Sequence, residues 1–258
     1  FREGDRIPNP HLRDTFRLLA DEGVDAFYEG LIAERIERDM MLNGGFITVH
    51  DLQNYELREI DPICTEIQGK KVWTVPPEGG GAILMEILNI LNREAFFRIR
   101  PFTAGFYHYL AQACKLAFID RMDYMGDTSL HGNKTYENIF NEKYANFLFG
   151  LINTGKDTPT ESYQSRMPGY AGSQYSDTGG GNETTHFSVL DHHGNAVSCS
   201  YTLNLRYGSK WSVTGCGFLL NGSMDGFSFN PGEPNYFNII GNRQNLFNRR
   251  KRPASNMA

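Results

Sequence analysis

The sequence has few cysteines, no metal-binding cysteine spacing and no long apolar run. Its four cysteines, Cys64, Cys114, Cys199 and Cys216, are far apart in a chain of 258 residues. None of them forms the Cys-x-x-Cys spacing of a structural zinc site or a thioredoxin-type redox site, so we expect buried free thiols. No apolar stretch approaches the roughly 20 residues that a membrane-spanning helix needs. These absences argue against a zinc ribbon and a thioredoxin, and they predict no membrane span.

Positive charge is also scarce. The chain has 25 Lys and Arg residues against 30 Asp and Glu residues, which gives a formal net charge of −5. Without a basic surplus there is little counterion release to drive binding to phosphates, so we expect no nucleic-acid partner. The one basic cluster, residues 249–252, is typical of a solvated turn. His192 and His193 are neighbours in a predicted turn, which does not put both on one face, and we expect no metal and no cofactor.

The chain does contain enough apolar material for a substantial core, since 40% of its residues are hydrophobic and 13% are aromatic. Helical patterns cover residues 10–23, 25–42, 83–91, 105–121 and 136–152. Asn9 followed by Pro10 predicts the start of the first helix, because asparagine caps a helix and proline suits its first turn. Gly44 and Gly45 predict the end of the second helix.

Two pairs of alternating segments predict β-hairpins. Residues 63–67 pair with residues 71–75, and residues 185–191 pair with residues 196–201 across a turn at 192–195. Helical patterns dominate the first half of the chain and strand patterns the second. Composition and pattern together therefore indicate an α+β protein.

A run of three glycines, Gly79 to Gly81, precedes the third helical pattern. Glycines at the start of a helix can cradle an anion, but this run has neither the P-loop spacing nor the dinucleotide-binding spacing. We therefore expect a structural turn.

Residues 154–183 are rich in Gly, Ser, Thr, Asp and Pro and poor in aliphatic side chains. Such a segment buries too little surface to offset its ordering entropy, so we expect a mobile linker. Thr184 follows it at the start of a predicted strand. A threonine hydroxyl is a weak nucleophile, and the free α-amine of a chain-terminal threonine can activate it. On this pattern alone, an ordinary strand threonine is the expected interpretation.

The residues that follow the linker carry a wider pattern. Residues 184–189 read Thr-Thr-His-Phe-Ser-Val, residues 201–204 read Tyr-Thr-Leu-Asn, and residues 217–221 read Gly-Phe-Leu-Leu-Asn. With these and further ordered matches, the sequence resembles the gamma-glutamyltranspeptidase family along nearly its whole length. The resemblance implies an N-terminal-nucleophile hydrolase with a four-layer αββα sandwich. It also implies that residues 1–183 are the C-terminal part of a large-subunit-like segment and residues 184–258 the N-terminal part of a small-subunit-like segment, together one domain of a fragment.

The family resemblance also implies catalytic roles. The first threonine of the family's Thr-Thr-His triplet is the nucleophile, which carries over to Thr184. Self-cleavage would break the Glu183–Thr184 bond and free the α-amine. Thr202, the threonine of the Tyr-Thr-Leu-Asn stretch, would hydrogen-bond the nucleophile and help to activate it.

Substrate-binding roles follow from the same resemblance. Asn204 would contact the α-carboxylate end of a bound glutamyl group, and Ser255 with Asn256 matches the family's carboxylate-binding serine pair. Ser223 falls at a polar position, commonly Glu or Gln, beside the site. Four positions depart from the pattern. Gly226 replaces an aspartate that holds the substrate amine, Asn256 replaces the second serine, Ser223 replaces the usual Glu or Gln, and Phe237 stands where several members have a lid tyrosine.

The resemblance implies a gamma-glutamyltranspeptidase-like threonine amidohydrolase and acyltransferase of glutathione metabolism. Its substrate would be a γ-glutamyl or other acyl amide, and the acyl group would pass to water or to an amino-acid or peptide acceptor. The large and small segments of one precursor would associate with each other. The sequence does not decide whether the protein forms a homodimer or in which compartment it lies. Family members are usually periplasmic, secreted or surface-exposed. Two alternatives also stay open: a related acylase with a non-glutamyl acyl substrate, and an unprocessed, inactive scaffold or fragment.

Overall fold

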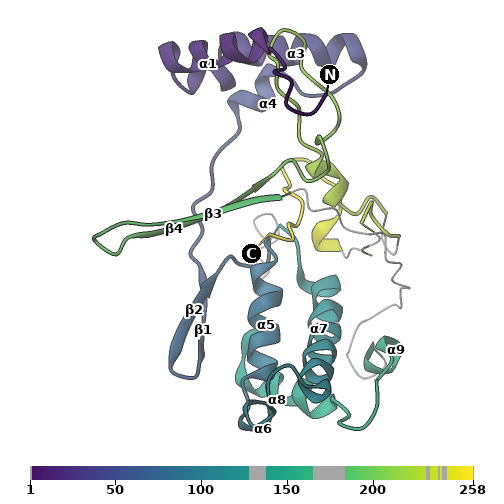
Figure 1. Ribbon diagram of the computed structural model, residues 1–258. Coiled ribbons are helices and arrows are strands. Elements are labelled where there is room, and N and C mark those ends of the chain that lie inside the picture. Colours follow the sequence, from purple (N-terminus) through teal and green to yellow (C-terminus); the bar gives the residue numbers. More distant parts are fainter. Residues whose placement is uncertain are drawn as a thin grey trace. The chain divides into compact units, whose positions relative to one another are not determined.

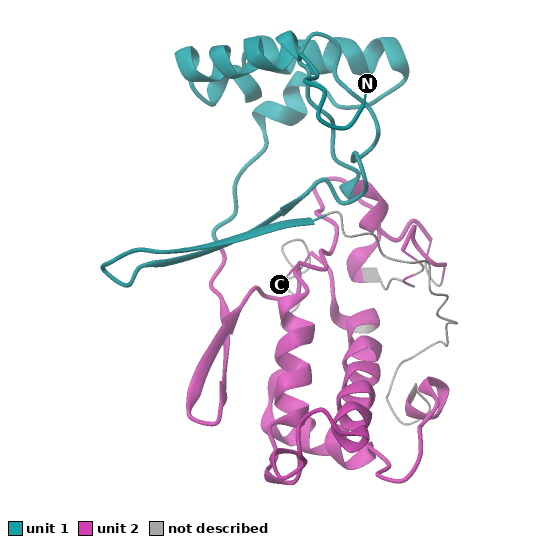
Figure 2. Ribbon diagram, viewed as in Figure 1, with its two compact units in different colours: residues 1–59, 181–223 teal, residues 60–180, 224–258 magenta. Residues whose placement is uncertain are grey.

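The computed structural model describes residues 2–127, 138–164, 184–230, 233–237, 239 and 243–257. The chain divides into two units, each built from two segments that are distant in sequence (Figure 2). Unit 1 is Phe1–Glu59 with Gly181–Ser223, and unit 2 is Ile60–Gly180 with Met224–Ala258. Helices and antiparallel strand pairs are both present, so the α+β prediction is confirmed, and the four-layer sandwich stays a prediction.

Unit 1 begins with a group of helices (Figure 1), namely α1 Pro10–Glu22, α2 Asp25–Tyr28, α3 Leu31–Asn43 and α4 Val49–Gln53. The predicted start of α1 is confirmed. The Asn9 side chain accepts a hydrogen bond from the Leu12 backbone N–H at 3.0 Å, which satisfies one of the donors that a helix start leaves open.

The prediction of one continuous helix over residues 25–42 is wrong, because two separate helices occupy this stretch. α2 ends after one turn, and the chain is extended at Gly30 before α3 begins. A side chain at Gly30 would lie only 3.0 Å from the Cα atom of Ala26, so glycine permits this tight link. The predicted end of α3 is confirmed, since Gly44 has the left-handed φ of 75° that a helix C-cap favours.

The apolar core of unit 1 joins its helices to the loop that follows the second hairpin. Its buried residues are Ala26, Ile32, Ile36, Met40, Val213 and Cys216. Polar contacts link the same parts of the chain. The Thr15 hydroxyl donates to the Cys216 carbonyl at 2.8 Å, and the Trp211 indole N–H donates to Asp39 at 2.5 Å. The N-terminal helices therefore hold residues 211–216 in place.

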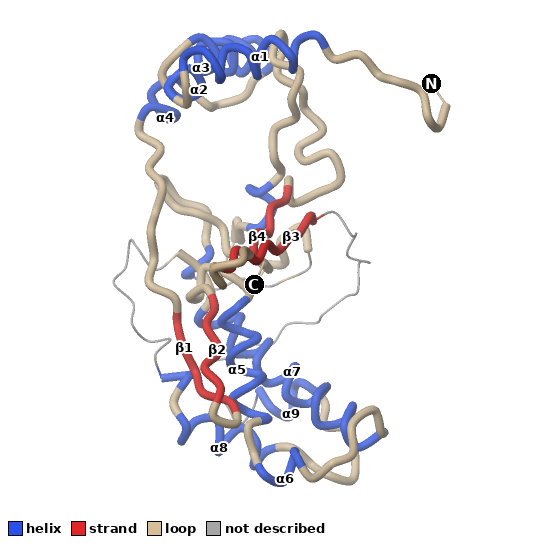
Figure 3. The backbone as a smooth tube through the Cα atoms, turned by 60° about the vertical axis from the view of Figure 1, so that its left-hand side comes forward, coloured by secondary structure: helices blue, strands red, loops and turns tan. Residues whose placement is uncertain are grey.

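Strands β3 (Thr184–Leu190) and β4 (Ala196–Thr202) form the second antiparallel hairpin that the sequence predicts (Figure 3). In its turn, the Asp191 carboxylate accepts a hydrogen bond from the Asn195 backbone N–H at 2.9 Å. Gly194 has a positive φ of 86°, which glycine adopts without strain. The turn sets the register of all seven residue pairs of the hairpin.

Unit 2 contains the first hairpin and a second group of helices (Figure 1). Its elements are β1 Ile63–Ile67, β2 Lys70–Thr74, α5 Gly81–Leu91, α6 Glu94–Phe97, α7 Ala104–Tyr124, α8 Glu142–Leu151 and α9 Thr160–Gln164. A short 3-10 helix, η2 Ser223–Gly226, lies at the unit boundary, and η3 Arg243–Asn245 follows. α5 and α7 lie side by side, and α8 packs on both. α8 begins later than residue 136, the predicted start, because Asn141 caps it.

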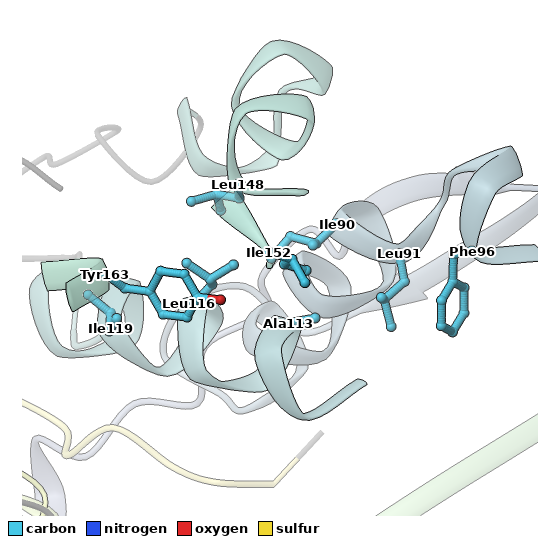
Figure 4. Packing of buried hydrophobic residues seen from close by; sticks show 9 residues of the cluster. All are labelled: Ile90, Leu91, Phe96, Ala113, Leu116, Ile119, Leu148, Ile152 and Tyr163. Carbon is cyan, nitrogen blue, oxygen red and sulfur yellow. The ribbon is translucent and has the colours of Figure 1, made fainter. Parts of the chain in front are cut away.

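The main core of unit 2 lies among α5 to α9 (Figure 4). Its buried side chains are Ile90, Leu91, Phe96, Ala113, Leu116, Ile119, Leu148, Ile152 and Tyr163. Tyr163 comes from the predicted linker, yet it is fully buried and its hydroxyl donates to Gln112 at 2.6 Å. Residues 154–164 are therefore anchored in unit 2, and residues 165–183 of the predicted linker lie outside the described residues. Within the described part of the chain, no helix has the length and apolar character to cross a bilayer.

Two acidic side chains, Glu86 on α5 and Asp120 on α7, are buried against each other in unit 2. The Tyr144 hydroxyl on α8 donates to Asp120 Oδ2 at 2.8 Å. Burial raises the pKa of Glu86 well above its ordinary range, and the neighbouring Asp120 adds to this effect. Burial also raises the pKa of Asp120, against the hydrogen bonds from Glu86 and Tyr144 that lower it. The folded pair therefore holds a proton up to a higher pH than the same side chains do in the unfolded chain.

We expect Glu86→Gln to stabilise the protein at pH 8, because glutamine keeps the shape of the side chain and needs no proton. In the wild type, the folded state holds a proton that the unfolded state loses above about pH 4.5, so the free energy of unfolding falls as the pH rises. Each unit by which folding raises a pKa corresponds to about 1.4 kcal/mol. Urea unfolding at pH 5 and pH 8 measures the difference. Glu94→Gln, at an exposed acid on α6, is the matched control, and a loss of stability of Glu86→Gln at pH 8 would contradict the prediction.

Candidate active site

Thr184 and Thr202 occupy the open end of the β3–β4 hairpin. Thr184 is the first residue of β3, Thr202 is the last residue of β4, and the two are direct partners in the register. Residues directly opposite each other in an antiparallel pair have Cβ atoms about 4.5–5.5 Å apart and point to the same face. The two threonines predicted to be catalytic therefore lie side by side.

The face of the hairpin that carries these threonines is polar. Alternate residues of a strand point to opposite faces, so this face consists of Thr184, His186, Ser188, Leu190, Ala196, Ser198, Ser200 and Thr202. His186 Nδ1 hydrogen-bonds Ser200 Oγ at 2.7 Å across the two strands. The opposite face carries exposed apolar side chains, among them Phe187, Val189, Val197 and Tyr201. The hairpin is therefore amphipathic, with the candidate nucleophile on its polar side.

Asn204 lies two residues beyond Thr202 and orients its hydroxyl. The Asn204 backbone N–H donates to Thr202 Oγ1 at 2.9 Å, and the Asn204 side-chain Nδ2 donates to the Gly222 carbonyl at 2.8 Å. Asn204 has a left-handed φ of 74°, which asparagine tolerates better than most residues. A hydroxyl that accepts a hydrogen bond from a backbone N–H still carries a proton to donate, as the predicted activation of Thr184 would require.

Ser255 and Asn256 lie in unit 2, in a segment that runs beside the glycine run. The Ser255 backbone N–H donates to the Glu78 carbonyl at 2.8 Å, and the Gly80 N–H donates to the Met257 carbonyl at 2.7 Å. A Cβ atom on Gly80 would clash with the backbone carbonyl of Asn256. The prediction that the glycine run is a structural turn is confirmed, and the absence of a side chain lets the two backbones meet.

The side chain of Asn256 is held by Arg121, a residue to which the sequence alone assigned no role. Arg121 Nη2, from the last turns of α7, donates to Asn256 Oδ1 at 2.6 Å. Arg121 is only 7% exposed, and burial lowers its pKa to about 10, so it stays cationic at neutral pH. The available signal in the sequence was an arginine within the largely apolar helical pattern of residues 105–121.

Gly226 marks the position where the family pattern has an acidic residue. Its carbonyl accepts hydrogen bonds from the side-chain amides of Asn235 at 3.0 Å and Asn245 at 2.8 Å. A Cβ atom at Gly226 would lie 3.3 Å from the Ala254 carbonyl oxygen, so a side chain needs a shift of a few tenths of an ångström. Ser223 is half-buried at the start of the same 3-10 helix, η2.

The candidate residues divide between the units, with Thr184, Thr202, Asn204 and Ser223 in unit 1 and Ser255 and Asn256 in unit 2. Glu183, on the acyl side of the predicted cleavage, lies outside the described residues. Across the described ranges, no group of three or more His, Cys, Asp or Glu side chains could hold a metal ion.

Comparison with known sequences places the whole chain, residues 1–258, in one family. A family profile described as gamma-glutamyltranspeptidase matches residues 1–258. The chain is 35% identical over 258 residues to a glutathione hydrolase proenzyme of Escherichia coli (strain K12), a match that covers 100% of this chain and 43% of that protein. It is 30% identical over 241 residues to a glutathione hydrolase proenzyme of Bacillus subtilis (strain 168), covering 91% and 41%. The chain thus spans less than half the length of these curated relatives.

Solved structures resemble the backbone as well. The cephalosporin acylase from Bacillus halodurans matches with a TM-score of 0.79 at 26% sequence identity, covering 99% of this chain and 42% of that one. The gamma-glutamyltranspeptidase of Helicobacter pylori matches with a TM-score of 0.59 at 31% identity, covering 62% and 46%. The chain is therefore similar to both an acylase and a transpeptidase.

We expect Gly80→Ala to destabilise unit 2 by about 1–3 kcal/mol, because the added methyl group would force the two backbones apart. Gly150→Ala is the matched control, since Gly150 lies within α8 and nothing lies within 4 Å of an added Cβ atom. Alanine there should be neutral or slightly stabilising. Urea unfolding of both variants measures the difference, and equal stabilities would contradict the close contact between Gly80 and Asn256.

Proposed function

This chain belongs to the gamma-glutamyltranspeptidase family, and we propose that it is part of a threonine amidohydrolase and acyltransferase that matures by cleaving its own Glu183–Thr184 bond. The observation that carries the proposal is the register pairing of Thr184 with Thr202. This pairing supports a nucleophile at the first position of a strand with an activating hydroxyl directly opposite. The proenzyme names of the E. coli and B. subtilis relatives agree with maturation by cleavage.

Maturation uses the same hydroxyl that later turns over substrate. Thr184 Oγ1 attacks the carbonyl carbon of Glu183, a C–O bond forms, and the C–N bond to Thr184 breaks. The Thr184 nitrogen takes the hydroxyl proton and becomes a free amine, which leaves an ester between Glu183 and the Thr184 side chain. Water then hydrolyses the ester, so that Glu183 ends in a carboxylate and Thr184 becomes an N-terminal residue.

Turnover repeats this chemistry on an external amide. The free α-amine of Thr184 accepts the hydroxyl proton, usually through a water molecule, while Thr202 donates a hydrogen bond to Thr184 Oγ1. The hydroxyl oxygen attacks the substrate amide, the leaving amine takes a proton, and the acyl group remains as an ester on Thr184. Water or an amino-acid or peptide acceptor then releases the acyl group, which gives hydrolysis or transfer.

The layered fold is also part of the proposal. We place residues 1–183 in a large-subunit-like segment and residues 184–258 in a small-subunit-like segment of one precursor, associated in a four-layer αββα sandwich. The amphipathic hairpin supports this placement, because its apolar face with Phe187 and Val189 is exposed in this part of the chain. A sandwich would cover that face with another layer. A homodimer of the whole protein is a compatible assembly.

The proposed substrate is a γ-glutamyl amide of the glutathione type, because the relatives are named glutathione hydrolases. Asn204, Ser223, Ser255 and Asn256 would bind its glutamyl group. A second candidate is an acylase with a non-glutamyl acyl group, and two observations favour it. Gly226 supplies no carboxylate for a substrate ammonium group, and the cephalosporin acylase matches 99% of the chain.

A panel of chromogenic anilides tests the proposed function in the full-length protein. We expect cleavage of an acyl p-nitroanilide by the wild type and no cleavage by Thr184→Ala. Thr202→Val removes the activating hydroxyl and keeps the shape of the side chain, so kcat should fall roughly 10²-fold. Thr185→Val, which alters the adjacent threonine on the opposite face of β3, is the matched control. Wild-type activity in Thr184→Ala would refute the proposed nucleophile.

The same panel separates the two substrate classes. We expect Gly226→Asp to raise the preference for γ-glutamyl over glutaryl p-nitroanilide by roughly tenfold or more. The two anilides differ only by the ammonium group of the γ-glutamyl substrate, and leaving such a buried charge unpaired costs about 2–5 kcal/mol. Gly226→Asn has the same shape without the charge and should leave the preference unchanged. The ratio of kcat/KM values for the two anilides is the measurement. An equal shift in both variants would exclude recognition of the ammonium group at this position.

A further inference from the structure

Arg121 is a buried cation whose charge has no counterpart in the described part of unit 2. It is 7% exposed, and the described residues form no ion pair with it. Its Nη2 donates to the neutral side chain of Asn256 at 2.6 Å, its guanidinium lies 6.0 Å from the centroid of the Phe118 ring, and its Nε has no hydrogen-bond partner there. A buried charge without an opposite charge is costly, so its retention calls for a role.

The guanidinium group dictates which way Asn256 points. All the polar hydrogens of arginine are donors and the group has no acceptor, so the amide atom that faces Arg121 must be the oxygen. The Asn256 NH2 group is therefore turned away from Arg121, and Asn256 itself is exposed. The backbone on both sides is fixed by the hydrogen bonds of Ser255 and Met257 to residues 78–80. Only the side-chain torsions of Asn256 are left, and Arg121 sets them.

Resting on the proposed function, we propose that Arg121 is a positioning residue for recognition of the substrate carboxylate. It holds Asn256 with both amide N–H groups toward the carboxylate of the acyl group, and its charge polarises the amide, which strengthens those donors. A carboxylate bound by Asn256 also supplies the negative charge that the buried guanidinium lacks. Arg121 thus acts through Asn256 and does not touch the substrate.

The test uses the processed full-length protein and two anilides that differ only in charge. Glutaryl p-nitroanilide carries the carboxylate, and its terminal carboxamide analogue does not. We expect Arg121→Met to raise KM for glutaryl p-nitroanilide about tenfold with kcat nearly unchanged, and to leave both constants for the carboxamide analogue nearly unchanged. Lys115→Met is the matched control, because it removes a cation of the same helix that is already paired with Asp157.

A double-mutant cycle shows whether Arg121 acts through Asn256. Adding Arg121→Met to Asn256→Ala should raise KM for glutaryl p-nitroanilide by less than about twofold, because the residue that Arg121 positions is already gone. Independent, multiplying effects of the two substitutions would overturn the proposal. A fall in kcat for both anilides in Arg121→Met would also overturn it, since that result indicates a purely structural role.

If Arg121→Met does not fold, a second variant, Asn256→Asp, tests the same proposal. Aspartate has the shape of asparagine and forms an ion pair with Arg121, so the variant should fold with an unchanged or raised Tm. It turns a carboxylate oxygen outward, and KM for glutaryl p-nitroanilide should rise more than tenfold, whereas the carboxamide analogue is affected little. An unchanged KM for the glutaryl substrate would refute the role of Arg121. Failure of the wild type to cleave either anilide would refute the proposed function itself, and this role with it.

Discussion

The register of the β3–β4 hairpin is the constraint on which the rest of the site depends. The turn with Asp191 and Gly194 fixes the pairing at one end of the hairpin, and that pairing places Thr184 opposite Thr202 at the other end. A slip of one residue would move one threonine to the opposite face, because side chains alternate along a strand. The proposed nucleophile and the hydroxyl proposed to activate it are therefore paired by a turn at the other end of the hairpin, six residue pairs along the ladder.

A second constraint of the same kind fixes the Ser255–Asn256 segment. Two backbone hydrogen bonds and the missing side chain of Gly80 let this segment lie directly on the turn before α5. Arg121 then sets the orientation of Asn256 from α7. In both units, therefore, local backbone geometry holds in place the polar groups that we propose bind or attack the substrate. Such preorganisation reduces the entropy that binding and reaction must otherwise overcome.

Local signals in the sequence predicted the elements well and the long-range contacts poorly. The Asn9 cap and both hairpins were predictable, because capping and strand alternation are properties of neighbouring residues. The break at Gly30 was missed, since glycine inside a helical pattern is compatible with either outcome. Arg121 could not be assigned, because its role comes from a contact with Asn256, far away in the sequence. The pairing of Thr184 with Thr202 is predictable from the hairpin, whereas the catalytic roles proposed for them rest on the family resemblance.

The proposed chemistry depends on self-cleavage at Glu183–Thr184, because only the free amine of Thr184 completes the proposed catalytic group. Intact-mass spectrometry of the full-length protein tests it most directly, with the Thr184→Ala variant alongside and folding of both checked by circular dichroism. We expect two fragments from the wild type, one of which begins at Thr184, and a single intact chain from the variant. If both folded proteins stay whole, self-cleavage is refuted and the chain is part of an unprocessed scaffold.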